Sequence, residues 1–244
     1  MPRRTKIVAT LGPATDDPSV IDSLIDAGVD VVRINLSHGS HEEHASRAEH
    51  VRNRARACGR QVGVLVDLQG PKIRCGAFSD GPVQLAEGDT FTLDVDYPID
   101  RGNREIVGCT YRELPEDLSR GDTLMVNDGK IVLWVDQVEG SKVVCKVKVG
   151  GELSDNKGIN KQGGGLSAPA LTDKDLQDIS FAADIEADYL AVSFVRTADD
   201  VIRAREMLME AGGRAAIVSK VERAEAVEAI DEIIEATDVI MVAR

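Results

Sequence analysis

The chain has 244 residues, 43% of them hydrophobic, and carries a formal net charge of −13 at pH 7. A chain of this length can bury one sizeable core, or one core and a smaller satellite domain. A surface this acidic repels nucleic acids and anionic membranes, so we expect no general binding to either.

Export, membrane insertion and metal binding by cysteine find no support in the sequence. No apolar run approaches the roughly 20 residues that span a bilayer, and the N-terminus has no apolar signal core. Cys58, Cys75, Cys109 and Cys145 stand at wide spacings without a C-x-x-C pattern. We therefore expect buried or neutral thiols in a cytoplasmic protein, because a reducing compartment keeps isolated thiols unpaired.

The first third of the sequence alternates strands and helices. Asp17-Pro18 opens a helix whose apolar positions share one face and which ends at Gly28. A second helix is expected over residues 42–57. The expected strands are residues 6–11, 31–36 and 62–67. Apolar strands separated by helices are typical of a parallel sheet covered by helices.

The pattern changes from about Cys75 to about Lys161, where short alternating strands replace helices. The turn signals there are Glu87-Gly88-Asp89, Asn127-Asp128-Gly129 and Glu139-Gly140-Ser141. Such spacing predicts a small all-β barrel or sandwich. Gly163-Gly164-Gly165 then forms a flexible joint that suits a hinge.

Helix–strand alternation resumes at Thr172, where Thr172-x-x-Asp175 resembles a capping box. Further strands are expected at residues 189–194, 215–220 and 239–243, which brings the total to six. A closed (β/α) barrel needs eight strands, and six alone would leave an open parallel edge. We therefore expect either a fragment of a longer chain or closure of the barrel by another element.

Polar residues at the C-terminal ends of these strands are the candidates for a site, because barrel active sites lie at that edge. Arg33 and Asn35 project to the same side; the arginine suits a phosphate, or it pairs with a structural carboxylate. Lys220 and Glu222 are also two residues apart. A lysine beside a metal-binding carboxylate can supply or relay a proton, and Glu suits Mg²⁺; the alternative is a surface ion pair.

The four histidines, His38, His41, His44 and His50, recur at helix-like spacings. No cysteine or carboxylate completes a tetrahedral zinc set with them. We therefore expect exposed helix histidines rather than a metal site.

Together, several segments resemble the signatures of the pyruvate kinase family, in that family's order and spacing. They are Arg33-x-Asn35-x-Ser37-His38-Gly39, residues 67–74, Ser193-Phe194-Val195-Arg196 and Ser219-Lys220-Val221-Glu222, with residues 10–15 and 241–244 matching too. The resemblance covers essentially the whole chain. It implies an α/β fold: an incomplete (β/α)8 TIM barrel, six of eight strands, with an inserted all-β lid domain. The implied boundaries are 1–70 and 167–244 for the barrel and 71–166 for the lid.

The resemblance also implies an activity and residue roles. Phosphoryl would pass between phosphoenolpyruvate and ADP, giving pyruvate and ATP, on Mg²⁺ or Mn²⁺. Arg33 would hold the phosphoryl group, Lys220 would stabilise its charge in the transition state, Ser193 would help bind substrate and Glu222 would ligate the metal. The implied nucleotide contacts are Asn35, Ser37, His38, Arg74 and Lys157, the last delivered by a lid that closes on hinges near Pro71 and Gly163.

One position refines this interpretation. Asn35, Ser37, Asp67 and the carbonyl of Leu68 match the family's monovalent-cation pocket. Many members have Glu where this chain has Lys72, and those members use potassium. An ammonium group at this position can supply the charge of the ion, so we predict catalysis without potassium. The alternative is that Lys72 is a solvated turn lysine.

The chain departs from the family at its end. In the family, the segment matching Met241–Arg244 is followed by a Gly-Asp-Leu segment whose Asp is the second metal ligand, then by strands seven and eight and a C-terminal regulatory domain. We expect this chain alone to be inactive or nearly so, and the full-length form to be a homotetramer. The alternatives are a non-catalytic remnant that binds phosphate, nucleotide or a partner subunit, and an unrelated barrel such as an aldolase or lyase. The second of these does not explain the lid or the Gly70-Pro71-Lys72-Ile73-Arg74 turn.

Overall fold

A computed structural model describes residues 4–243 and divides them into two compact units. The first unit comprises the described residues up to Pro71 and from Ala170 onward, and the second is Lys72–Pro169. Arg244, the last residue of the final motif, lies outside the described residues. Among the described helices, none combines the length and apolar character needed to cross a membrane.

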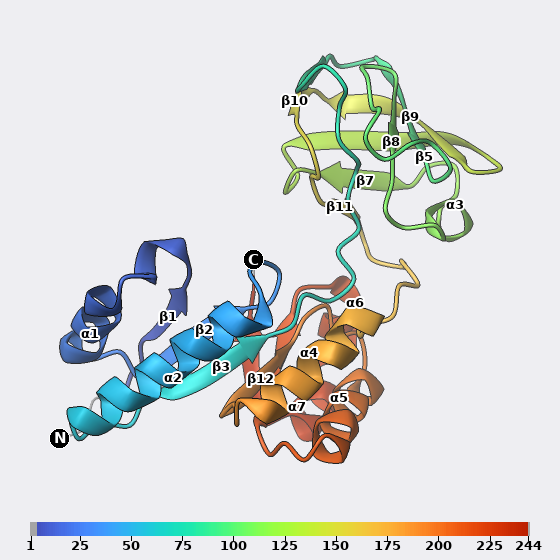
Figure 1. The fold of residues 1–244 in the computed structure, drawn as a ribbon. Helices are drawn as coiled ribbons and strands as arrows, with labels where there is room; N and C mark the ends of the chain where they lie inside the picture. Colours follow the sequence, from blue (N-terminus) through green and yellow to red (C-terminus); the bar gives the residue numbers. More distant parts are fainter. Residues whose placement is uncertain (1–3, 244) are drawn as a thin grey trace. The chain divides into compact units, whose positions relative to one another are not determined.

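The first unit is an α/β fold around a curled parallel sheet (Figure 1). In residues 4–243 the strand order of this sheet is β1-β2-β3-β12-β13-β14. The strands are β1 (Val8–Leu11), β2 (Val31–Asn35), β3 (Gly63–Asp67), β12 (Tyr189–Val192), β13 (Ala216–Val221) and β14 (Val239–Val242). Each strand pairs with its neighbour in parallel register, for example Asn35 with Asp67. Their carboxyl ends therefore meet at one edge of the sheet.

The helices of the first unit follow their sequence signals. They are α1 (Pro18–Ala27), α2 (His41–Ala57), α4 (Asp173–Asp184), α5 (Ala198–Glu210), α6 (Ala224–Glu228) and α7 (Ile230–Ala236), with a 3-10 turn η1 (Pro13–Thr15) before α1. Asp17 caps α1 by accepting from the backbone of Ser19, and Gly28 ends it in the left-handed conformation (φ 101°). The capping box of Thr172 and Asp175 opens α4. Both predicted signals are confirmed.

Helix α2 corrects the expectation that the helix histidines are exposed. His44 is buried, and with Ala48, Val51 and Ala55 it forms the face that packs on the sheet. The spacing of four, three and four residues is that of one helix face. His44 is tolerated there because its ring nitrogen bonds to the carbonyl oxygen of His38 at 2.7 Å.

The second unit is built mainly of β-strands. One mixed sheet has the order β11-β7-β8-β9-β5-β6, and β10 pairs with β4 in a second ladder. The elements are β4 (Val83–Leu85), β5 (Thr90–Asp94), β6 (Ile106–Gly108), α3 (Leu114–Asp117), β7 (Thr123–Val126), β8 (Ile131–Glu139), β9 (Lys142–Val149), β10 (Gly151–Leu153) and β11 (Ile159–Lys161).

Turn chemistry sets the hairpins of the second unit, as the sequence predicts. Asn127 and Asp128 have φ of 55° and 56° and Gly129 has 82°, so this run supplies the positive φ angles of the turn between β7 and β8. Gly140, at φ 57°, turns β8 into β9. Gly163-Gly164-Gly165 lies inside the second unit, whereas the division between the units falls after Pro71 and after Pro169.

Candidate active site

Asp67, the last residue of β3, lies at the centre of a charged cluster in the first unit. Its side chain is only 1% exposed, and its two oxygens have different cationic partners. Nε of Arg33, on β2, donates to Oδ2 at 2.6 Å, and Nη2 approaches the same oxygen at 2.6 Å. Nζ of Lys220, on β13, lies 3.2 Å from Oδ1. One buried carboxylate therefore holds two cations that come from different strands.

Ser193, directly after β12, orients the ammonium group of Lys220. Its hydroxyl accepts a hydrogen bond from Nζ of Lys220 at 2.8 Å and donates to the carbonyl oxygen of Leu68 at 2.7 Å. The hydroxyl also lies 3.4 Å from Oδ1 of Asp67. Because Ser193 and Asp67 are both buried, the ammonium group is fixed in position before any ligand arrives.

Glu222 completes the cluster. Its Oε1 lies 3.2 Å from Nζ of Lys220, and its Oε2 accepts from the backbone N–H of Phe194 at 3.0 Å. Phe194 has φ 57°, a strained conformation for a residue with a side chain. The Lys220–Glu222 pair is not the surface ion pair of the alternative interpretation, since the Lys220 side chain is only 10% exposed.

Gly70 allows the end of β3 to lie against this cluster. At φ +65°, a Cβ atom at position 70 would lie 2.8 Å from Cδ2 of Phe194 and 3.0 Å from Cβ of Ser193. Distances of this size are clashes with side-chain carbons. A glycine is therefore required here, by both the backbone conformation and the space available.

Arg33 retains hydrogen-bonding capacity although it is ion-paired. A guanidinium group has five N–H donors; in Arg33 the Nε donor bonds to Asp67, Nη2 is ion-paired with the same oxygen, and Nη1 donates to Oγ1 of Thr10 at 3.1 Å. At least two donors of this side chain, which is 25% exposed, take no part in these three interactions and can bind an anion. A structural carboxylate and an anion site are thus compatible at Arg33, because Asp67 positions a guanidinium group that stays partly exposed.

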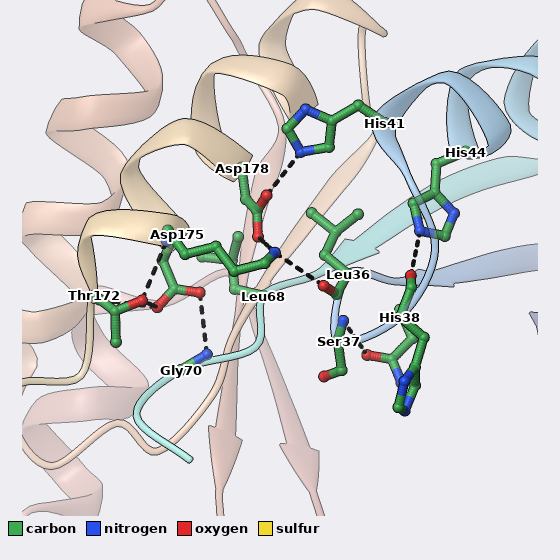
Figure 2. Close-up of polar contacts among 12 residues, drawn as sticks. Leu36, Ser37, His38, His41, His44, Leu68, Gly70, Thr172, Asp175 and Asp178 are labelled. Carbon is green, nitrogen blue, oxygen red and sulfur yellow. Dashed lines mark hydrogen bonds and ion pairs between the residues drawn. The ribbon is translucent and has the colours of Figure 1, made fainter. Parts of the chain in front are cut away.

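The turn after β2 carries the other candidate residues of the first unit. The side-chain oxygen of Asn35 accepts from the backbone N–H of Ser37 at 3.1 Å, and the N–H of Leu36 donates to the carbonyl oxygen of Asp67 at 3.0 Å. The ring of His44 then fixes the carbonyl oxygen of His38, as Figure 2 shows. Burial lowers the pKa of His44 below its ordinary value of 6.5, so the ring is held in its neutral form.

Polar side chains of α4, two of them buried carboxylates, contact the segments that follow β2 and β3 (Figure 2). Asp178 bonds to His41 at 2.8 Å and to Lys174 at 2.5 Å, and Nζ of Lys174 also donates to the carbonyl oxygen of Leu36 at 2.9 Å. Asp178 is 1% exposed. The helix is thereby tied to the turn that carries the candidate residues.

Asp175 joins the two segments at which the second unit is inserted. Its Oδ2 accepts from N and Oγ1 of Thr172 at 2.8 and 2.6 Å, and its Oδ1 accepts from the N–H of Gly70 at 3.0 Å. Asp175 is fully buried. Gly70 lies shortly before Lys72 and Thr172 shortly after Pro169, so one carboxylate ties together the two segments that flank the insertion (Figure 2).

The remaining candidates, Lys72, Arg74 and Lys157, belong to the second unit. Arg74 pairs with Gly158 in an isolated bridge, which places it beside Lys157, and its Nη1 donates to the carbonyl oxygen of Asn156 at 3.3 Å. The carbonyl oxygen of Lys72 accepts from Oγ1 of Thr110 at 3.4 Å. Among residues 4–243, neither Arg74 nor Lys157 forms an ion pair with a carboxylate.

Comparison with known proteins bears on this arrangement. A family model described as "Pyruvate kinase, barrel domain" matches residues 2–244. The chain belongs to the pyruvate kinase family. It is 54% identical over 245 residues to the pyruvate kinase of Haemophilus influenzae and 55% identical over 245 residues to pyruvate kinase II of Salmonella typhimurium, with 99% of the chain and 51% of each relative covered. The pyruvate kinase of Mycobacterium tuberculosis is 46% identical over 244 residues, 100% of the chain and 51% of the relative. The chain thus spans about half the length of the curated relatives it matches.

Pyruvate kinases generally use Mg²⁺, and the donors near Lys220 can be tested against that ion. Glu222 is 16% exposed, whereas both oxygens of Asp67 are taken by cations. Within the described part of the chain, no group of three or more His, Cys, Asp or Glu side chains is placed to hold a metal. Mg²⁺ commonly binds through one or two carboxylates, with water and substrate phosphates completing its shell. These donors therefore fit a substrate-completed Mg²⁺ site and do not fit an all-protein cage.

The sequence motifs of the pyruvate kinase family anticipate most of this cluster. Arg33, Ser193, Lys220 and Glu222 are brought together around Asp67. Thr10, which bonds to Arg33, was not predicted as a contributor to the cluster. Outside the cluster, the capping role of Asp175 was expected but its bond to Gly70 was not, and the contacts of Lys174 and Asp178 were not predicted. For Thr10 a signal existed, because it lies at the end of a strand that neighbours β2.

Proposed function

We propose that the protein containing this chain is a pyruvate kinase, which transfers phosphoryl from phosphoenolpyruvate to ADP and forms pyruvate and ATP in glycolysis. The observation that carries the proposal is the cluster itself. Arg33 and Lys220 are fixed on opposite oxygens of one buried carboxylate, with Glu222 beside Lys220, at the carboxyl edge of a parallel sheet. Membership of the pyruvate kinase family supports the same conclusion.

The proposed roles follow from charge and position. The remaining donors of Arg33 bind oxygens of the phosphoryl group, for which a planar guanidinium fork is well suited. The ammonium group of Lys220, held by Asp67, Ser193 and Glu222, stabilises the negative charge that develops during transfer. Phosphoryl transfer depends on such positioning and fixed positive charge more than on covalent chemistry by the protein.

Glu222 is the proposed protein ligand of a divalent ion, Mg²⁺ or Mn²⁺. When bound, the ion would neutralise phosphate charge. For its part, Glu222 is oriented by the N–H of Phe194 on one oxygen and by Nζ of Lys220, 3.2 Å from the other.

Asn35, Ser37, His38, Arg74 and Lys157 are the proposed nucleotide contacts. Arg74 and Lys157 lack carboxylate partners among residues 4–243, so their charges remain available to an incoming polyphosphate. We assign the second unit the role of a lid that excludes water, and the first unit that of six strands of an eight-stranded barrel. The full-length protein is proposed to be a cytoplasmic homotetramer.

Lys72 is proposed to replace potassium at the monovalent-cation pocket formed by Asn35, Ser37, Asp67 and the carbonyl of Leu68. A comparison of kcat in sodium-only and potassium buffers of equal ionic strength tests this. The wild-type ratio should stay within about twofold, and Lys72→Glu should create potassium dependence, because a carboxylate there restores the need for a mobile cation. Strong potassium activation of the wild type would contradict the assignment.

The proposed activity is tested with the natural full-length product and the 244-residue chain in parallel, in an assay that couples pyruvate formation to NADH oxidation. The full-length protein should turn over phosphoenolpyruvate and ADP and should require a divalent cation. The chain alone should be at least about 100-fold slower, because its described site offers one accessible carboxylate to the metal. Nucleotide or phosphate binding by the full-length protein without pyruvate formation would instead indicate a non-catalytic binding protein.

A further inference from the structure

Cys75 and Cys109 face each other across an isolated antiparallel bridge in the second unit. The neighbouring backbone hydrogen bonds show whether this is a hydrogen-bonded or a non-hydrogen-bonded pair. The N–H of Gly76 donates to the carbonyl of Gly108 at 2.8 Å, and the N–H of Thr110 donates to the carbonyl of Arg74 at 3.0 Å. The bonds thus flank the two cysteines, which form a non-hydrogen-bonded pair. In such pairs the Cα atoms are about 4.5 Å apart and the side chains are closest.

This separation is compatible with a covalent bond between the sulfur atoms. Disulfides join residues whose Cα atoms are roughly 4.4–6.8 Å apart, so no large backbone movement is needed. Both side chains project from the same face of the pair, because directly opposed residues do so in any antiparallel ladder. Both thiols are free, and their residues are 0% and 5% exposed.

The local environment slows the oxidation of the pair. Burial raises the pKa of Cys109 to about 11, with the neighbouring Cys75 adding to the effect, and burial also raises the pKa of Cys75. The thiolate is the nucleophile in disulfide exchange, so few molecules react at any moment. Reaction therefore requires sustained oxidising conditions and local opening of the segment.

We propose that Cys75 and Cys109 are a modification site at which a low-molecular-weight disulfide forms an intramolecular Cys75–Cys109 bond. The thiolate of one cysteine attacks a sulfur of the oxidant and expels one thiolate, which leaves a mixed disulfide on the protein. The second cysteine, as its thiolate, attacks the protein sulfur and expels the other half of the oxidant. The two protein thiols lose two electrons and two protons, and the oxidant becomes two thiols.

The bond would constrain the segment that carries two of the nucleotide contacts, a consequence that rests on the proposed function. Arg74 immediately precedes Cys75, and its backbone N–H bonds to Oγ1 of Thr110 at 3.0 Å. The N–H of Cys75 donates to the carbonyl of Lys157 at 2.9 Å. Closing the pair therefore restricts the main chain beside Arg74 and Lys157, which the two thiols leave free to adjust. The KM for ADP should rise several-fold, with the KM for phosphoenolpyruvate unchanged.

The modification is tested on the folded chain by equilibration in hydroxyethyl disulfide and its thiol, over a series of ratios, followed by acid quenching and peptide mass spectrometry. At the oxidising end, a linked peptide containing Cys75 and Cys109 should accumulate, and the count of titratable thiols should fall from four to two. Excess reductant should restore all four. The variant C145S should still form the link, whereas C75S and C109S should not.

Several results would contradict the proposed modification site. They are persistence of four thiols at every ratio, mixed disulfides without the linked peptide, or links to Cys58 or Cys145 in comparable yield. A matched sample in urea separates native selectivity from random pairing, since an unfolded chain joins its cysteines without preference for this pair. The ADP measurement on the oxidised full-length protein is independent: a formed link with an unchanged KM for ADP contradicts the predicted effect of the bond on nucleotide binding, not the modification.

Discussion

In the first unit, Arg33 and Lys220 each contact an oxygen of buried Asp67, whereas in the second unit Arg74 and Lys157 have no carboxylate partner among residues 4–243. The first arrangement fixes the cations in position and offsets their charge. The second leaves positive charge uncompensated on half-buried side chains. A preorganised cluster suits charge that develops in a transition state, and uncompensated charge suits capture of a polyanion. A fixed, ion-paired cluster thus contrasts with two cations that have no carboxylate partner in the described part of the chain, and the kinetics of variants in each unit test whether the two arrangements serve different steps.

The largest effect should come from removing the cation that the cluster fixes most tightly. Lys220→Met in the full-length protein should lower kcat by about 1000-fold, because a preorganised donor to developing charge is lost. The KM values should change little. The matched control is Lys174→Met, which removes a lysine that contacts Asp178 and the carbonyl of Leu36 but not Asp67. Comparable kcat losses in both variants would contradict a specific role of Lys220 in the chemical step.

A second effect should appear in stability, at the buried carboxylate that ties together the two segments flanking the insertion. Asp175→Asn should lower the unfolding free energy by about 1–3 kcal/mol more than Asp200→Asn, because a buried bond to the N–H of Gly70 is impaired only in the first variant. Asp200 is the matched control, since it fills the same capping-box position in α5 and accepts from the N–H of Arg196. Urea unfolding of the chain measures both. Equal losses would show that Asp175 acts as a helix cap alone.

Much of the fold was predictable because its signals are local. Apolar runs bounded by turn residues gave the strands to within about two residues, and Asp17 and Gly28 gave the ends of α1. β2 ends at Asn35, one residue earlier than predicted, because the Asn35 side chain bonds to the N–H of Ser37 and begins a turn. The Cys75–Cys109 register was not predictable, since it depends on which segments pair.

The site was predictable where strand ends converge and not where distant segments meet. Parallel strands end at one edge, so Arg33, Ser193 and Lys220 had to lie near one another. The bond between Asp175 and Gly70 joins residues that are 105 positions apart, and no local pattern encodes it. The burial of His44 was detectable from its spacing to Ala48 and Val51, but the many charged residues of α2 concealed that face.

A smaller effect should appear as a pH dependence of the first unit. The folded state lowers the pKa of His44 through burial, so the unfolded chain binds a proton more tightly. Stability present above the ordinary value of 6.5 is therefore lost as the pH falls from 6.5 toward the lowered pKa, by at most about 1.4 kcal/mol per pH unit. Urea unfolding gives the unfolding free energy at pH 7.5 and at about pH 5.5. The difference between these two free energies should be smaller in His44→Gln than in the wild type. An unchanged difference would exclude His44 as its source.

The central claim is that the first unit binds the phosphoryl group of phosphoenolpyruvate and the second contributes to binding the nucleotide. Its most direct test is steady-state kinetics of full-length Arg33→Gln and Arg74→Gln with each substrate varied in turn. Arg33→Gln should lower kcat and raise the KM for phosphoenolpyruvate by at least about tenfold, and Arg74→Gln should raise the KM for ADP alone. If Arg74→Gln instead raises the KM for phosphoenolpyruvate, or Arg33→Gln raises only the KM for ADP, the roles assigned to the two units are wrong.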